Sequence, residues 1–245
     1  MYKVNNVNIN YINYGSKEGK DIVFLHGWGQ NIQMMKMLAD PLSKENNIVI
    51  VDLPGFGEST EPTYDWMVDD YVEAIKSLLE SLKIKKPILV GHSFGGKISL
   101  LYSSKYEVEK LVVLGSPYKK EIEKLSLKTK MLKAAKKVPV LNKLEGFAKK
   151  HIGSTDYRNA SEIMRKILVN TVNYDISSNL SKIKCPTLII WGTNDEAVPI
   201  EDAYELEKII KDAAVIEYEG CSHYAYLERL NQTVNVLRSF IGGND

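Results

Sequence analysis

Short apolar runs, each closed by a turn signal, recur along the chain and predict strands that are buried on both faces of a sheet. These runs occupy 22–26, 48–54, 87–92, 110–116, 187–192 and 214–220. Ahead of them, apolar and polar residues alternate in VNINYINY (7–14), which predicts one half-buried antiparallel strand. Between most of the runs, apolar residues recur at helical spacing, over 31–42, 66–82, 94–105, 201–211 and 226–241. Strands that alternate with helices predict an α/β fold, with a mostly parallel sheet of roughly eight strands and helices on both faces.

Residues 117–180 interrupt this alternation, because they contain no strand-like run. A loop of this length without secondary structure of its own is uncommon in a compact domain. We therefore predict a core formed by 1–116 and 181–245 and a helical insertion over 117–180, with one helix at 160–173. Five apolar residues at near-helical spacing predict another helix earlier in the insertion: Ile122, Leu125, Met131, Leu132 and Ala135.

Charge separates the insertion from the rest of the chain. The 245 residues are 44% hydrophobic and 26% charged, with a net charge of +1, which is ordinary for a globular protein and gives no sign of a nucleic-acid partner. Residues 118–175, however, carry 14 Lys and Arg against six Asp and Glu, a net charge of +8, which leaves −7 on the remainder. The basic insertion is therefore a candidate surface for an anionic partner.

The remaining composition predicts a cytoplasmic protein without a bound metal or cofactor. The chain has two cysteines, which is too few for a secreted disulfide framework. Its first residues show no signal-peptide pattern, and no apolar run approaches the roughly 18 residues of a transmembrane helix. The four histidines and two cysteines lack the paired spacing of metal ligands.

The segment VGHSFGGK (90–97) contains the strongest chemical signal, because Ser93 has glycines two residues before and two residues after it. A G-x-S-x-G motif between a buried strand and a helix places its serine on a sharp turn, where the neighbours must be small. Gly91 and Gly95 meet that need, and Gly96 permits close packing of helix and strand. Serine becomes a nucleophile when a base, a group that orients the base and oxyanion donors surround it. Without those partners, the segment is simply a glycine-rich turn.

A second segment, FLHGWG (24–29), supplies the expected oxyanion loop, since an apolar strand runs into His-Gly-x-Gly. In this arrangement one donor is the backbone N–H of the residue after the nucleophile, and the other lies in a loop after an earlier strand. We therefore predict that Phe94 N–H and Trp28 N–H bind the oxyanion, and that His26 braces the loop. The alternative is a plain glycine turn.

Two further segments supply an acid and a base. In WGTNDEAVP (191–199), Asp195 follows a buried strand and is a better candidate than Glu196, although a solvated loop carboxylate would look the same. In YEGCSHYAYLER (218–229), His223 follows the last predicted strand, where a structural histidine is the alternative. His223 nevertheless completes the chain order Ser, Asp, His that accompanies a G-x-S-x-G turn.

Together with VDLPGFGEST (51–60), these motifs resemble the α/β-hydrolase superfamily, in its group of small, cap-bearing, esterase-like serine hydrolases. The resemblance runs from about residue 20 to the C-terminus. It implies an α/β-hydrolase fold with a helical lid inserted after the sixth strand. It also implies catalysis by Ser93, Asp195 and His223. A serine at the turn argues against the dehalogenases and epoxide hydrolases of this fold, which use aspartate there.

The function that the resemblance implies is hydrolysis of a carboxylic ester of a small or medium substrate through an acyl-enzyme. Alternatives are action on an acyl group bound to acyl-carrier protein or CoA, C–C bond hydrolysis, lactone opening, and a ligand receptor without turnover. The basic lid is either a solvated surface, a docking face for an anionic carrier, or a contact with an anionic membrane. Three lid residues are candidates to face Ser93: Tyr118, Met131 and Tyr174.

Overall fold

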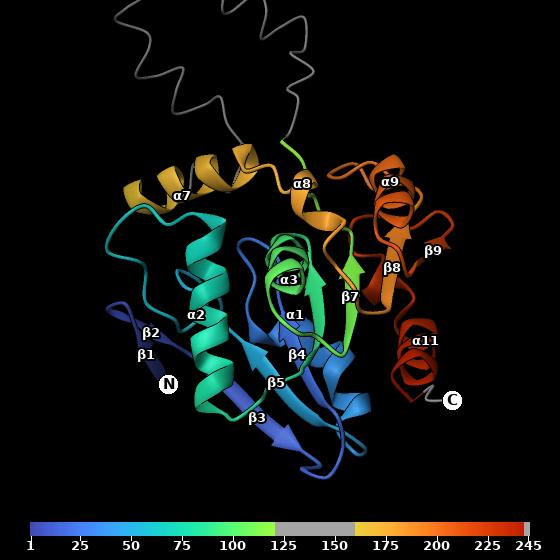
Figure 1. Cartoon of the computed structure of the whole chain (residues 1–245), viewed down its shortest axis with the longest axis horizontal. Helices are drawn as coiled ribbons and strands as arrows, with labels where there is room; N and C mark the ends of the chain where they lie inside the picture. Colours follow the sequence, from blue (N-terminus) through green and yellow to red (C-terminus); the bar gives the residue numbers. More distant parts are fainter. Residues whose placement is uncertain (121–159, 243–245) are drawn as a thin grey trace, which may run out of the picture.

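A seven-stranded sheet forms the centre of the computed structural model, which describes residues 1–120 and 160–242 (Figure 1). Six of its strands are parallel, and β3 pairs antiparallel with β5 at one edge. The spatial order is β3 (Tyr11–Gly15), β5 (Asn47–Val51), β4 (Asp21–Leu25), β6 (Ile88–His92), β7 (Lys110–Leu114), β8 (Thr187–Gly192) and β9 (Ala213–Tyr218). The mostly parallel sheet predicted from the apolar runs is confirmed.

The alternating segment 7–14 is two strands rather than one. Its first half, β2 (Val7–Ile9), pairs with β1 (Tyr2–Val4) in a separate two-stranded sheet, whereas β3 joins the main sheet. The break falls at Asn10, whose backbone N–H donates to Ser59 Oγ at 2.8 Å. The alternation indicates that one face of each strand is buried, but it does not indicate that the chain changes sheets. The main sheet has seven strands, compared with the roughly eight that we predict from the sequence.

Helices cover both faces of the sheet, as the alternation of elements predicts. One face carries α2 (Val68–Ser81), α3 (Phe94–Lys105) and α9 (Glu201–Ile209), and the other carries α1 (Ile32–Ala39), α10 (Ala225–Glu228) and α11 (Leu230–Gly242). Successive strand residues point to opposite faces, so Val23 and Leu25 enter one core while Ile22 and Phe24 enter the other. None of the helices in the described parts of the chain is long and apolar enough to span a bilayer.

The described end of the insertion contains α7 (Glu162–Asn173) and α8 (Ser177–Leu180), which lie across the end of the molecule to which β7 and β8 point (Figure 1). Helix α7 matches the helix predicted at 160–173 and begins after Ser161, whose hydroxyl accepts the Met164 N–H at 3.2 Å. The insertion follows β7, which is the fifth strand of the main sheet in chain order. The helix predicted around 122–135 lies outside the described residues, and the lid remains a prediction.

A buried carboxylate at the end of β5 holds the neighbouring loops in place. Asp52 is 2% exposed, and its Oδ1 accepts the N–H of Ile32, the first residue of α1, at 2.7 Å. Its Oδ2 accepts from Asn10 Nδ2 at 2.8 Å and from Glu58 N–H at 2.9 Å. A Cβ at Gly57, whose φ is +56°, would lie 2.2 Å from this carboxyl group, so the turn around it requires glycine. Asp52 thereby joins the start of α1 to the segments around Asn10 and Glu58.

Removal of this carboxylate should destabilise the fold. We expect Asp52→Ala to lower the free energy of unfolding by about 3 kcal/mol, because it leaves three donors without their acceptor. Urea denaturation followed by circular dichroism measures the change. Asp52→Asn is the matched control, since its carbonyl oxygen still accepts, and it should lose less. Equal stability of Asp52→Ala and the wild type would contradict this role.

Candidate active site

Ser93 occupies a strained turn between β6 and α3. Its backbone has φ +50° and ψ −113°, in a region that residues with a side chain rarely adopt. The Ser93 N–H donates to Leu114 O at 2.9 Å, and the Ser93 carbonyl accepts the Lys97 N–H at 3.0 Å. These bonds anchor the turn to β7 on one side and to the first turn of α3 on the other. The serine side chain is therefore presented at the carboxyl edge of the sheet.

The glycines of the motif are required by close contacts. A Cβ at Gly91 would lie 2.5 Å from the Gly95 carbonyl oxygen, and one at Gly95 would lie 2.2 Å from the Leu25 carbonyl oxygen. At Gly96 it would lie 1.6 Å from Ser116 Oγ. No side chain fits at these distances, so the need for small residues inferred from the sequence has a direct steric cause.

Asp195 and His223 form a hydrogen-bonded pair on the loops that follow β8 and β9. The distance from Asp195 Oδ2 to His223 Nδ1 is 2.8 Å, and the Asp195 side chain is 1% exposed. The other carboxylate oxygen accepts the N–H groups of Ala197 and Val198, each at 2.9 Å. Since Nδ1–H donates to the carboxylate, Nε2 of a neutral His223 is an acceptor. Gly115, at φ +53°, lies against the pair, where a Cβ would be 3.2 Å from Asp195 Oδ2.

One cavity brings Ser93 and His223 together. Both residues line it with Trp28, from the loop after β4, and Tyr224, from the segment before α10. Glu196 lines the same cavity, whereas its neighbour Asp195 binds the histidine. The structure thus gathers the predicted nucleophile, base and acid from three loops at one edge of the sheet.

The two predicted oxyanion donors lie beside Ser93. The rings of Trp28 and Phe94 pack with centroids 5.4 Å apart, and Gly95 N–H donates to His26 O at 3.0 Å, which joins the loop after β4 to the start of α3. Within residues 1–120 and 160–242, neither Trp28 N–H nor Phe94 N–H has an acceptor. Phe94 N–H is moreover the first amide of α3, where the helix dipole favours negative charge.

Comparison with known sequences identifies the family. The sequence profile of the alpha/beta hydrolase family matches residues 22–235. The chain belongs to the alpha/beta hydrolase family. In hydrolases of this fold the strained turn after a buried strand is the nucleophile elbow.

Several known alpha/beta hydrolases are similar to this one over most of their length. The AB hydrolase superfamily protein YisY of Bacillus subtilis is 27% identical, with 91% of each chain covered. The human monoacylglycerol lipase ABHD6 is 28% identical over 90% of this chain and 74% of its own. The pimeloyl-[acyl-carrier protein] methyl ester esterase of Aliivibrio fischeri is 26% identical over 91% of this chain and 94% of its own. Among solved structures, the alpha/beta hydrolase MGS-M2 from a deep-sea metagenome library has a TM-score of 0.80 at 21% identity, covering 100% of this chain and 98% of its own.

Two further histidines of this hydrolase are buried in neutral form. His26 accepts the Leu53 N–H through Nε2 at 2.9 Å and donates Nδ1–H to Gly27 O at 2.7 Å. Burial lowers the pKa of His26 to about 4. Its contacts support the bracing role predicted from the sequence.

The second buried histidine is a supporting residue that the sequence analysis missed. His92 donates Nε2–H to the carbonyl oxygen of His223 at 3.1 Å, and the two rings pack with centroids 4.8 Å apart. Burial, and to a lesser degree the neighbouring His223, lower the pKa of His92 to about 3. Its position next to Ser93 is the signal that could have pointed to it. His92 holds the backbone of the predicted base against the nucleophile elbow.

Some residues of the insertion lie near the candidate site. Of the three residues predicted to face Ser93, Tyr118 and Tyr174 bind Glu205 and Asp69 through their hydroxyls, and neither lines the described cavity that Ser93 shares with His223. Met131 lies outside the described residues. Among the described residues of the insertion, Pro117, Lys119 and three residues of α7 line a cavity with Ser93; the three from α7 are Leu168, Thr171 and Val172. Among residues 1–120 and 160–242, no group of three His, Cys, Asp or Glu side chains is placed to hold a metal ion.

The buried histidines should make the fold acid-sensitive. Their pKa values of about 4 and 3 in the folded protein lie below the ordinary value of 6.5, so between pH 6.5 and pH 4 the unfolded chain binds more protons. Stability is therefore lost as the pH falls through that window. We expect the free energy of unfolding to drop by about 3 kcal/mol between pH 7 and pH 5.

Urea denaturation across this range measures the effect, and His26→Asn is the informative variant. With one of the two histidines removed, the slope against pH should decrease by up to about 1.4 kcal/mol per pH unit. An unchanged slope would show that His26 is not held neutral in the fold.

Proposed function

We propose that this alpha/beta hydrolase cleaves a carboxylic ester of a small or medium substrate through an acyl-enzyme on Ser93. The observation that carries the proposal is the 2.8 Å bond between Asp195 and His223, with His223 lining the same cavity as Ser93. A base held by a buried acid, next to a serine on a strained turn, is the arrangement that activates a serine hydroxyl.

In this mechanism His223 Nε2 takes the Ser93 proton while Ser93 Oγ attacks the ester carbonyl carbon. Asp195 accepts the Nδ1–H at 2.8 Å, which holds the required tautomer and stabilises the charged imidazole that forms. Trp28 N–H and Phe94 N–H donate to the developing oxyanion, a contribution of about 3 kcal/mol per donor in comparable sites. His223 then protonates the leaving alcohol and afterwards activates the water that releases the acid.

The relatives support the ester as the bond that is cleaved. One of the similar proteins is named as a monoacylglycerol lipase and another as a methyl ester esterase. Both names describe hydrolysis of a carboxylic ester, although the acyl groups and alcohols differ. We therefore propose the same reaction for this chain. The shape of its own pocket determines which ester it accepts.

The first test is the removal of the nucleophile. We expect Ser93→Ala to lower kcat for a short p-nitrophenyl ester by a factor of about 10⁶, because the variant lacks the hydroxyl on which the acyl-enzyme forms. A stopped assay of nitrophenol release gives the rates, and mass spectrometry after treatment with a fluorophosphonate locates the labelled residue. Wild-type turnover in Ser93→Ala would contradict the mechanism. A labelled Ser93 with no turnover of any ester would favour a ligand receptor instead.

The acid is tested separately by Asp195→Asn, which keeps the size of the side chain. We expect kcat to fall by about 10⁴, because the amide no longer selects the tautomer in which Nε2 accepts a proton. Glu196→Gln is the matched control, since Glu196 lines the cavity while Asp195 binds His223. A larger loss of kcat in Glu196→Gln than in Asp195→Asn would reverse the assignment.

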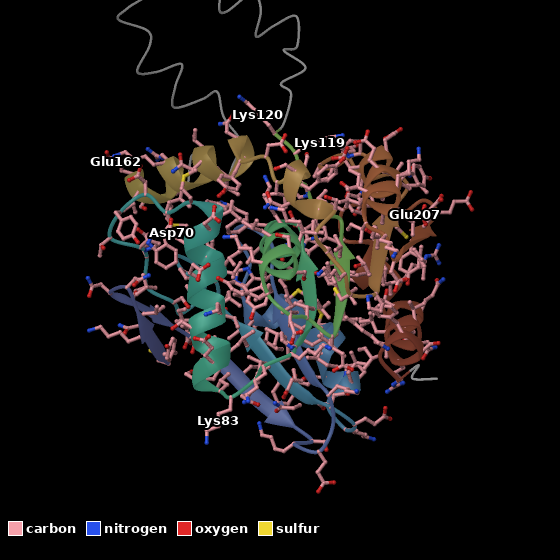
Figure 2. All side chains as sticks on the ribbon, viewed as in Figure 1. Asp70, Lys83, Lys119, Lys120, Glu162 and Glu207 are labelled. Carbon is pink, nitrogen blue, oxygen red and sulfur yellow. The ribbon has the colours of Figure 1, made fainter. Side chains whose placement is uncertain are left out.

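A second candidate function is hydrolysis of an ester or thioester whose acyl group is bound to a carrier. The methyl ester esterase among the relatives is named for a substrate on acyl-carrier protein, and residues 118–175 of this chain carry a net charge of +8. Lys119 and Lys120, at the start of this basic segment, lie at the end of the molecule where α7 and α8 lie (Figure 2). An acidic carrier would be attracted to that end.

The salt dependence of hydrolysis distinguishes a docking surface from an ordinary solvated surface. If an acidic carrier docks on the basic segment, kcat/KM for an ester on acyl-carrier protein should fall at least about tenfold between 50 mM and 500 mM NaCl. Hydrolysis of a neutral p-nitrophenyl ester should stay constant in the same experiment. Equal salt dependence for the two substrates would identify the basic segment as an ordinary solvated surface.

A further inference from the structure

The loop after β4 forms a tight turn over residues 27–30. Gln30 N–H donates to the Gly27 carbonyl oxygen at 3.2 Å, which closes the turn. The third residue, Gly29, has φ +71°, as a type II turn requires at that position. Trp28, the predicted oxyanion donor, is the second residue, and the bond that closes the turn does not use its N–H. The turn therefore leaves this N–H for another acceptor.

Two consecutive peptide groups set the direction of the Trp28 N–H. A trans peptide group is planar, with its C=O and N–H pointing in opposite directions, so holding one end orients the other. The group between His26 and Gly27 is held at both ends. Its carbonyl accepts Gly95 N–H at 3.0 Å, and its N–H donates to the side-chain oxygen of Gln30, Oε1, at 3.0 Å. The next group is held at the Gly27 carbonyl by Gln30 N–H and by His26 Nδ1–H at 2.7 Å, and its other end is the Trp28 N–H.

This turn lies directly against the nucleophile elbow. A Cβ on Gly27 would lie 3.2 Å from Ser93 Cβ and 2.9 Å from His92 Nδ1, which leaves no room for a side chain. A small rotation of the Gly27 peptide groups would therefore move the Trp28 N–H relative to Ser93. The Gln30 side chain opposes that rotation because it binds the Gly27 N–H.

The amide of Gln30 also approaches the loop of the predicted base. Its Nε2 lies 3.4 Å from the hydroxyl of Tyr224, the residue after His223, and Gln30 lines the cavity that contains Ser93 and His223. Oε1 lies 3.3 Å from His92 Nδ1 as well. A neutral His92 that donates through Nε2 has no proton on Nδ1, so these two atoms do not form a hydrogen bond. The Gly27 N–H, which can only donate, determines that Oε1 faces the turn.

We propose that Gln30 is a positioning residue of the oxyanion hole. Its side-chain oxygen holds the Gly27 N–H and thereby directs the Trp28 N–H at the oxygen that becomes negative in the transition state. This inference rests on the ester hydrolysis proposed above and adds a residue to that reaction. Because the donor that Gln30 orients acts on the transition state more than on the bound ester, loss of the Gln30 amide should lower kcat and leave KM nearly unchanged.

Gln30→Met tests this role, because it removes the amide and keeps a side chain of similar length. We expect kcat for p-nitrophenyl butyrate to fall about tenfold and KM to stay within about twofold, since loss of a whole oxyanion donor costs about 10²–10³ and this variant only loosens one. Titration of Ser93 with a fluorophosphonate corrects the rates for the amount of active enzyme. Gln33→Met, at an exposed glutamine of α1, is the matched control and should keep the wild-type kcat.

A thiono ester distinguishes an effect on the oxyanion from other causes. Sulfur accepts hydrogen bonds weakly, so an oxyanion donor contributes little when sulfur replaces the carbonyl oxygen. We expect kcat of Gln30→Met for p-nitrophenyl thionobutyrate to fall less than about threefold below that of the wild type. A disturbed base or an altered fold would instead slow both substrates equally.

The outcomes separate this inference from the function on which it rests. Equal losses for the two substrates, a wild-type kcat in Gln30→Met, or the same loss in Gln33→Met would overturn the role of Gln30 while ester hydrolysis stands. Hydrolysis of neither substrate by the wild type would overturn both. If Gln30→Met does not fold, Gln30→Asn decides by the same comparison, because its shorter side chain withdraws the oxygen from the Gly27 N–H.

Discussion

The close approach of α3 to the ends of β4 and β7 is the constraint on which this site depends. Gly95 and Gly96 allow the helix to approach the Leu25 carbonyl and Ser116, and in the turn just before it Ser93 has a positive φ of +50°. Such a conformation costs on the order of 1–3 kcal/mol and persists only where surrounding contacts hold it. The bonds from Ser93 N–H to Leu114 O and from Gly95 N–H to His26 O provide that support. The same two bonds also hold the end of β7 and the loop after β4 next to the serine, so they support the strained turn and the assembly of the site together.

The electrostatics around the predicted base follow from burial. His26 and His92 have ring nitrogens that are committed to backbone groups, and their low pKa values keep them uncharged near neutral pH. Asp195 accepts from two backbone N–H groups in addition to His223, so its carboxylate cannot rotate away. The carboxylate that binds His223 directly is that of Asp195. His92 has a separate role, because it binds the backbone carbonyl of His223 and packs against its ring.

The sequence predicted most of the core strands and helices and the residues of the candidate site, because each of those signals has a local cause. Gly91 and Gly95 report a steric need within a few residues of Ser93, and Asp195 and His223 each follow a parallel strand whose carboxyl end lies at the same edge of the sheet. Signals with a distant cause were missed. The partner of His92 is 131 residues away, and the alternation around Asn10 is the same whether or not the chain changes sheets.

Lys97 Nζ donates to the Thr171 carbonyl oxygen at 2.8 Å, and this bond has a consequence for how the insertion can evolve. Lys97 belongs to the helix that carries the nucleophile, so the last turn of α7 is fastened to the catalytic core rather than only to its own neighbours in sequence. The side of the cavity that Thr171 lines next to Ser93 is thereby held by a side chain from the helix that follows the nucleophile. Sequence changes elsewhere in the insertion can leave this contact intact, so the two ends of the insertion are under different constraints.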